Sequence, residues 1–327
     1  MTGFGGIARL VFLRARAHRL LLAAALLTVL LTTAVLATLT AYSGAIGDAA
    51  LRHALQDRRN AADTSLVVKA DVPGERRRAA DNAVRTVARQ TFDGLPVTVR
   101  TLLRSGPYAL PRSLQPESQR SGDPDLTHFA ALDRGRVRLV EGRLPRAADG
   151  LVEVALPQTA ARTLHLAPGA RFTLTDRLRG PSVQVTVTGV YRPVRVDDPY
   201  WLLDDLHGRG INKLDFTTYG PLLADPGVLT DGTVSAGSAG WLASADFGTV
   251  TTARTDALRE TALAGNAALR KEPSLGGATT ASTSLPEVLD RTDRSPAAVP
   301  LHPPDRGPPT GAARGLRPAA GGGAAEQ

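Results

Sequence analysis

Leu20–Tyr42 reads LLLAAALLTVLLTTAVLATLTAY and contains no charged residue, no proline and no glycine. An α-helix rises about 1.5 Å per residue, so this run can cross the roughly 30 Å hydrocarbon core of a bilayer. A cleaved signal peptide is the alternative, because the preceding residues are basic and Ala41-Tyr42-Ser43 is an acceptable small-x-small cleavage site. The apolar regions of signal peptides are shorter, at about 7–15 residues. We therefore expect a transmembrane helix over residues 20–42.

The charges on either side of this run predict its orientation. Residues 1–19 contain no acidic residue and four basic ones, namely Arg9, Arg14, Arg16 and Arg19. The segment that follows Tyr42 carries both signs of charge. Because cytoplasmic flanks are enriched in Lys and Arg, residues 1–19 are expected to form a cytoplasmic basic segment in a cell membrane protein. The main domain is then extracytoplasmic.

Composition excludes several classes of protein. The chain has 327 residues, no cysteine and a formal net charge of +8. Without cysteine there can be no disulfide scaffold, thiolate zinc site, iron–sulfur cluster or cysteine nucleophile. Half of the net charge lies in residues 1–19, so the remainder is close to neutral for its length. A nucleic-acid-binding protein concentrates positive charge on its folded domain, and we expect no nucleic acid partner.

A mixed α and β domain is expected over residues 43–294. Its first part has the pattern strand, helix, strand over residues 64–103, and a similar order returns over residues 240–284. The first of these helices has one apolar face, formed by Ala80, Val84, Val87, Ala88 and Thr91. Two βαβ units at opposite ends of a domain predict that the middle of the domain is an insertion.

The middle of the domain has a different pattern. Residues 104–127 are rich in Pro, Ser, Arg, Gly and Asp, and we expect an irregular loop there. Residues 141–195 alternate in hydrophobicity and predict a β-rich lobe that holds one helix, at residues 158–166. The predicted fold class is α+β: one N-terminal transmembrane helix, then a mixed α/β extracytoplasmic domain with a β-rich inserted lobe, then a disordered C-terminal tail.

Four stretches of the chain resemble a known family. They are E-G-R-L-P (141–145), V-E-V-A-L-P-Q-T-A-A-R-T-L-H-L-A-P-G-A-R-F-T-L (152–174), V-T-V-T-G-V-Y-R-P (185–193) and D-P-Y-W (198–201). In this order they resemble the extracytoplasmic core domain of FtsX-like, MacB-type ABC transporter permeases. The resemblance extends over about residues 7–294, because the basic segment and the apolar run lie where this family has its first transmembrane helix.

The resemblance implies a permease subunit that couples ATPase-driven helix movement to an extracytoplasmic domain. It also implies two partners: a separate ABC ATP-binding subunit, and a permease subunit with which the chain forms a homodimer or heterodimer. The phosphate-binding pattern G-x-x-x-x-G-K-S/T does not occur in the sequence. We therefore expect that the chain is not an enzyme and has no cofactor of its own.

The C-terminal end departs from the family pattern. Permeases of this family continue from a helix such as 285–294 into further transmembrane helices. Residues 295–327 are instead rich in Pro and Gly, contain no apolar run of spanning length, and are expected to be disordered. This favours a truncated or frameshifted permease, with a genuine single-span relative as the other interpretation. The alternative function is a single-span, membrane-anchored extracytoplasmic binding or adaptor protein.

One acidic run is the best metal candidate in the sequence. It contains Asp197, Asp198, Asp204, Asp205 and His207. Its spacing does not match a calcium-binding EF-hand, and the sequence has no H-E-x-x-H pattern for zinc. A solvated turn that flanks two aromatic residues is the simpler interpretation, so we expect no metal site.

A serine and two aromatic residues are the remaining candidates. Ser238 lies in A-G-S-A-G (236–240), which lacks the first glycine of the hydrolase pattern G-x-S-x-G. Tyr200 and Trp201 could form a contact patch, but aromatic residues of a core or an interface are the better interpretation. The sequence therefore predicts no catalytic, cofactor-binding or metal-binding residue.

Overall fold

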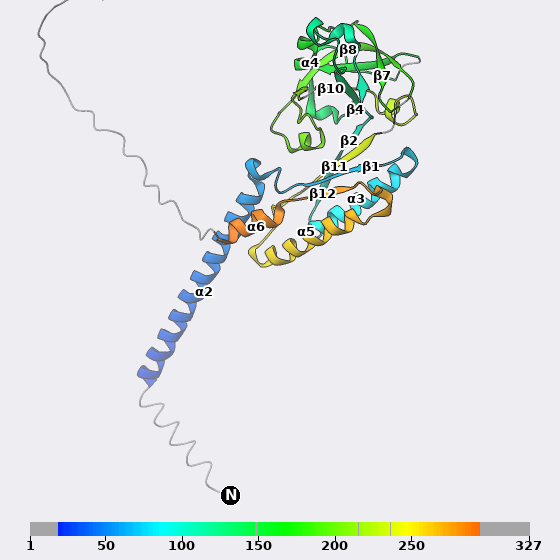
Figure 1. The fold of residues 1–327 in the computed structure, drawn as a ribbon. Helices are drawn as coiled ribbons and strands as arrows, with labels where there is room; N and C mark the ends of the chain where they lie inside the picture. The colour runs from blue at the N-terminus through cyan, green and yellow to red at the C-terminus, as the bar shows by residue number, and fades with distance from the viewer. Residues whose placement is uncertain (1–18, 148–149, 179, 215, 236, 295–327) are drawn as a thin grey trace, which may run out of the picture.

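The computed structural model describes residues 19–294, except 148–149, 179, 215 and 236. Its first element is α2 (Arg19–Gln56), a single helix of 38 residues that projects from the folded part of the chain (Figure 1). Most of the basic segment expected at 1–19, and the tail expected at 295–327, lie outside the described residues. Within the described part, α2 is the one helix that is long and apolar enough to cross a membrane.

From Leu20 to Tyr42 the surface of α2 has no charged side chain on any side. Its large side chains are more than half exposed from Leu20, at 81%, to Tyr42, at 66%. The hydroxyls of its threonines donate hydrogen bonds to backbone carbonyls one turn earlier, as Thr28 does to Ala24 at 2.9 Å. An exposed apolar surface of this extent is unfavourable in water, whereas internally satisfied hydroxyls suit a lipid environment. The length and composition of α2 therefore fit a bilayer.

An α/β lobe is formed by residues 64–104 and 238–294, and it brings the two predicted βαβ segments into one sheet. The strands lie in the order β12, β1, β11, β2, and each neighbouring pair is antiparallel. Helices α3 and α5 pack together on one face of this sheet (Figure 1). The elements are β1 (Leu66–Asp71), α3 (Arg77–Thr91), β2 (Val97–Arg104), β11 (Ser238–Ala245), α5 (Thr255–Arg270), β12 (Thr280–Ser282) and α6 (Leu285–Arg294).

The core of the α/β lobe lies between the sheet and its helices. On α3 the predicted apolar face is confirmed: Ala80, Val84, Ala88 and Thr91 are buried, and Val87 packs against the core. Helix α5 approaches α3 closely at Gly265, where a Cβ atom would lie 2.0 Å from Thr91 Oγ1. Glycine is therefore required at this crossing, although it weakens an isolated helix.

A barrel lobe is formed by residues 108–234, between β2 and β11. Its six principal strands close into a ring in the order β4, β3, β7, β8, β6, β10 and back to β4. These strands are β3 (Tyr108–Ala109), β4 (Leu126–Ala131), β6 (Val152–Pro157), β7 (Arg171–Asp176), β8 (Val183–Pro193) and β10 (Thr217–Leu223). Strand β5 (Val137–Gly142) pairs with β8, strand β9 (Ile211–Lys213) pairs with β10, and α4 (Gln158–Thr163) follows β6.

Short 3-10 helices complete the description. They are η1 (Arg58–Asn60), η2 (Gly74–Arg76), η3 (Arg112–Leu114), η4 (Glu117–Gln119), η5 (Arg134–Arg136), η6 (Pro199–Leu203), η7 (Pro226–Leu229), η8 (Thr252–Arg254) and η9 (Pro273–Leu275). The predicted helix at 158–166 is shorter in the structure, because α4 ends at Thr163 and His165 has a positive φ of 53°. A left-handed residue cannot continue an α-helix.

The β-rich lobe is larger than residues 141–195. Strands β3 and β4 precede that range, and β10 follows it. Residues 104–127, expected to be an irregular loop, contain β3, η3, η4 and the start of β4. Tyr108 on β3 is fully buried and stacks edge-on against Phe129, with ring centroids 5.1 Å apart. The described chain is thus α+β, with an N-terminal apolar helix, an α/β lobe and a barrel lobe.

Candidate functional site

The C-terminal end of α2 is built into the α/β lobe. Leu51 and Leu55 are 1% and 2% exposed and belong to the core that α3 and α5 cover. The carboxylate of Asp48 accepts hydrogen bonds from Thr252 N and Thr252 Oγ1, at 2.7 and 2.9 Å. These hydrogen bonds lower the pKa of Asp48. The apolar helix therefore passes into the folded lobe without a linker.

The C-terminus of α2 is also capped. Asn60 Nδ2 donates a hydrogen bond of 2.8 Å to the carbonyl of Ala54 in the last turn. Helix α6 packs beside α2, so the described chain enters and leaves the α/β lobe on the same side (Figure 1). Because a helix terminus has carbonyls without helical partners, this cap fixes the point where α2 ends.

Segment 197–208 of the barrel lobe, which contains η6, packs against the α/β lobe. Tyr200 and Trp201 are almost fully buried, in a cluster with Leu102 and Leu242 from the sheet face opposite α3 and α5. The hydroxyl of Tyr200 donates to Thr101 O in the α/β lobe at 3.2 Å and accepts from Asp133 N in the barrel lobe at 2.8 Å. These aromatic residues therefore form the apolar contact between the lobes.

The acidic run is a solvated turn only in part: Asp197, Asp205 and His207 are exposed, whereas Asp198 is half-buried and Asp204 is buried. Asp204 is 1% exposed, and its carboxylate accepts hydrogen bonds from the backbone amides of Leu206 and Gly208, at 3.2 and 2.8 Å. Asp198 caps η6 by accepting a hydrogen bond of 3.0 Å from Tyr200 N. These carboxylates satisfy backbone donors that would otherwise be buried without partners.

The described residues contain no group of three His, Asp or Glu side chains that could hold a metal ion. Asp205 points instead toward the α/β lobe, where it pairs with Lys69 of β1 at 2.9 Å and with Arg104 of β2. Burial lowers the pKa of both cations, and the charge of Arg104 lowers that of Lys69 further. The acidic run therefore acts as an ionic contact between the lobes.

A buried histidine lies behind this contact. Burial, followed by the charge of Arg104, lowers the pKa of His128 to about 3. The Nε2 atom of His128 is 3.9 Å from Asp204 Oδ1 and has no hydrogen-bond partner among the described residues. Burial also raises the pKa of Asp204. Sequence reasoning missed His128, because a lone histidine in a strand carries no local signal.

In the described part of the chain, the Ser238 side chain forms no hydrogen bond with a histidine. It begins β11 and pairs with Asp71 of β1. The preceding Gly237 packs where the two connections between the lobes cross, and a Cβ atom there would be 2.2 Å from Arg104 O. The close approach of two backbone segments therefore explains why residue 237 is a glycine.

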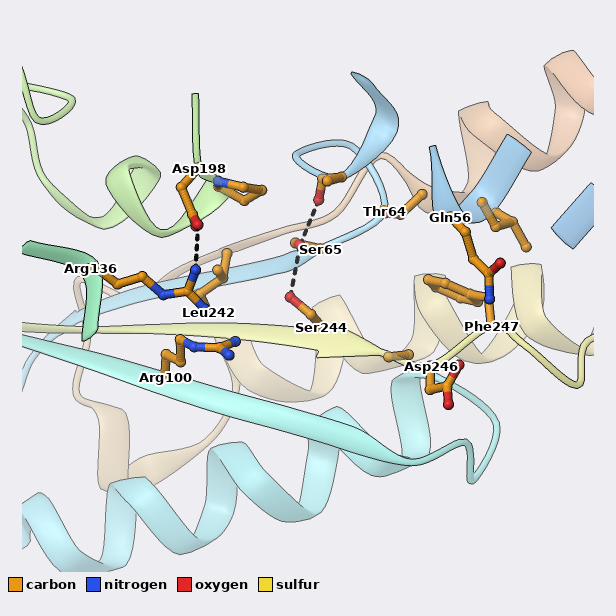
Figure 2. A pocket seen from close by; sticks show the side chains of 14 residues that line it. Gln56, Thr64, Ser65, Arg100, Arg136, Asp198, Leu242, Ser244, Asp246 and Phe247 are labelled. Carbon is orange, nitrogen blue, oxygen red and sulfur yellow. Dashed lines mark hydrogen bonds and ion pairs between the residues drawn. The ribbon is translucent and has the colours of Figure 1, made fainter. Parts of the chain in front are cut away.

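A pocket of about 330 Å³ lies at the same junction (Figure 2). Its walls come from the end of α2, residues 61–65, strands β2 and β11, and η6. It opens on the face of the sheet that α3 and α5 do not cover. Figure 2 shows the ion pair of Arg136 with Asp198 at one side, and the hydrogen bond between Ser65 and Ser244 at the centre. The sequence gives no sign of this pocket, since its residues come from distant segments.

Comparison with known proteins gives little. No protein-family model and no curated protein matches the sequence. Among solved structures, the chain is similar to the crystal structure of a domain from a Porphyromonas gingivalis protein provisionally described as a permease. The two are 12% identical, the match covers 67% of this chain and 88% of the other, and the TM-score is 0.30. Similarity at this level carries no argument about fold or function.

Proposed function

We propose that this chain is a permease subunit, or part of one, of an FtsX/MacB-type ABC transporter, anchored in the membrane by α2. In this proposal α2 transmits movement within the membrane to the extracytoplasmic lobes. The observation that best supports it is that one helix carries both the apolar surface from Leu20 to Tyr42 and the buried residues Leu51 and Leu55. A flexible tether would serve an anchor equally well, but it could not transmit movement.

The dimensions of α2 suit this role. Between Tyr42 and Gln56 the helix extends for roughly 21 Å at about 1.5 Å per residue, so the α/β lobe would be held at a fixed height above the bilayer. The hydrogen bonds of Asp48 to Thr252 fix the rotation of the helix relative to the lobe. A tilt or rotation of α2 would therefore be passed to the α/β lobe, and through segment 197–208 to the barrel lobe.

The basic residues before α2 support a cytoplasmic N-terminus, and thus an extracytoplasmic position for the lobes. ATP hydrolysis would come from a separate ABC ATP-binding subunit, because the sequence has no phosphate-binding loop. A second permease subunit, identical or different, would complete the assembly. The competing proposal is a single-span binding or adaptor protein, which the junction pocket favours.

Site-specific photo-crosslinking in native membranes separates the two proposals. A photoreactive residue is placed at single positions within 1–19 of the full chain, and a matched set is placed in the exposed part of the barrel lobe. The permease proposal predicts an ABC ATP-binding subunit among the products from residues 1–19 and not among those from the barrel lobe. Absence of such a subunit from every position in 1–19, with efficient crosslinking to other proteins, would refute the proposal.

A further inference from the structure

Part of one sheet face in the α/β lobe is not covered by helices. Helices α3 and α5 cover one face, where Trp241 is buried, and η6 covers the part of the opposite face around Leu102. Beyond η6 this second face is bounded by the end of α2 and by residues 61–65, and the space between them is the junction pocket (Figure 2). Its volume of about 330 Å³ lies within the usual range for sites that bind small molecules.

The pocket has apolar walls and one available cation. Ala61, Pro199 and Ala245 contribute partly exposed apolar surface, and Leu55, Leu242 and Phe247 also line the pocket but are at most 4% exposed. Arg100 faces the pocket beside Leu242, because the two residues are directly paired between β2 and β11 and so lie on the same face of the sheet. In the described part of the chain Arg100 forms one ion pair, from Nε to Asp133 Oδ2 at 3.5 Å. Its two terminal nitrogens therefore remain as donors.

The neighbouring arginine is already engaged. Arg136 pairs with Asp198 through Nη1 and with Asp133 through Nε. Among the described residues, Arg100 is thus the pocket guanidinium that has both terminal nitrogens free to pair with a ligand. A guanidinium presents a planar fork of donors that matches the two oxygens of a carboxylate.

The other polar groups limit where a ligand can carry charge. The Ser65 hydroxyl donates to Ala61 O at 2.7 Å, so Ser244 donates to Ser65 across the 3.1 Å that separate their oxygens. Ser244 Oγ therefore presents an acceptor to the pocket, which disfavours a second anionic group there. The carboxylate of Asp246 at the far end of β11 disfavours one as well.

We propose that this pocket binds a small amphipathic monocarboxylate. Its carboxylate pairs with the terminal nitrogens of Arg100, and its apolar chain lies along β11 past Ser244 toward Ala245, between this strand and residues 61–65. From Leu242 to Asp246 the strand advances roughly 13 Å at about 3.3 Å per residue, which suits an acyl chain of medium length. A ligand in this position contacts α2, the sheet and η6 together.

The test uses the full chain in nanodiscs, with octanoate as the probe and empty nanodiscs as the blank for lipid partitioning. Saturable binding is measured by calorimetry and by ligand-observed NMR. We expect octanoate to bind, and octan-1-ol and octylammonium to bind at least tenfold more weakly. Absence of saturable octanoate binding to the folded protein would overturn the proposal.

Variants locate the site. Arg100→Gln removes the charge and is expected to weaken octanoate binding at least tenfold, whereas Arg100→Lys keeps the charge without the fork and gives an intermediate loss. Ser244→Leu fills the pocket and is expected to weaken binding with Arg100 intact. Arg138→Gln, at an exposed position on β5, is the matched control and leaves binding unchanged. Equal affinity in Arg100→Gln and Ser244→Leu, with native melting, would contradict the site.

Discussion

Leu51 provides a stringent test of whether α2 is part of the α/β lobe. It lies near the end of α2, is 1% exposed, and belongs to the core cluster of the lobe. Replacing a buried leucine by alanine removes apolar atoms and leaves a cavity, with a typical cost of about 2–5 kcal/mol. We therefore expect Leu51→Ala to lower the free energy of unfolding by about 3 kcal/mol. In a folded region of this size, that corresponds to a fall in Tm of roughly 6–12 °C.

The matched control is Leu36→Ala, in the same helix but at a position 58% exposed. Both variants are compared with the parent chain in nanodiscs. Thermal unfolding is followed by the fluorescence of Trp241, which is buried in the α/β lobe, in a Trp201→Phe background. We expect the transition to shift in Leu51→Ala and to stay in place in Leu36→Ala. Equal melting temperatures for the two variants would show that α2 does not stabilise the lobe.

Four further predictions concern the lobes and the membrane. Burial lowers the pKa of His128 from 6.5 to about 3. Below pH 6.5 the unfolded chain therefore binds a proton that the folded protein excludes, and the free energy of unfolding falls by up to about 1.4 kcal/mol per pH unit as the pH decreases toward 3. Denaturant unfolding at pH 7.5 and 5.5 should therefore show a smaller pH dependence in His128→Gln, and an unchanged dependence would contradict this assignment. Asp205→Asn should cost less than about 1 kcal/mol, because the ion pairs are partly exposed, yet widen the distance distribution between spin labels on the two lobes; an unchanged distribution would exclude an ionic contact that restrains the lobes. Val84→Asp places a charge in the core under α3 and should destabilise the α/β lobe by several kcal/mol, on the order of an unpaired buried charge, whereas native melting would mean that this face is not buried. Protease added outside spheroplasts should digest residues after Tyr42. Protection of these residues would mean that the lobes face the cytoplasm, opposite to the predicted orientation.

The local pattern of the sequence predicts part of this fold. The uncharged run from Leu20 to Tyr42 and the spacing of Ala80, Val84 and Ala88 each lie within one helix, so their meaning depends on neighbouring residues alone. The two βαβ segments can be predicted in the same way. Their interleaving into the order β12, β1, β11, β2 is set by contacts between distant strands.

The barrel was harder to predict, because its closure is not local. The pairing of β4 with β10 joins Leu126 to Thr218. Strand β3 has two residues, Tyr108 and Ala109, and lies among prolines that indicate a loop. A strand this short has no detectable alternation, so only its pairing with β4 and β7 defines it.

The sequence pattern did not predict that aspartates of segment 197–208 are buried between the lobes, and the reason is electrostatic. Aspartate is rarely buried, so a run with several aspartates predicts a solvated turn. Asp198 and Asp204 are accommodated because backbone amides of their own segment donate to them. That compensation depends on the path of the backbone, which the sequence pattern does not contain. The pocket beside Arg100 depends in the same way on segments that only the fold brings together.

The distance between α2 and the α/β lobe tests the central claim, that the two move as one body. The chain has no cysteine, so Ser43→Cys on α2 and Ala267→Cys on α5 give two unique spin-label sites, both exposed. Pulsed electron paramagnetic resonance of the full chain in nanodiscs measures the distribution of distances between them. We predict one narrow distribution, which broadens when Leu51→Ala is added. A broad distribution in the parent chain, as a flexible tether would give, would contradict the claim.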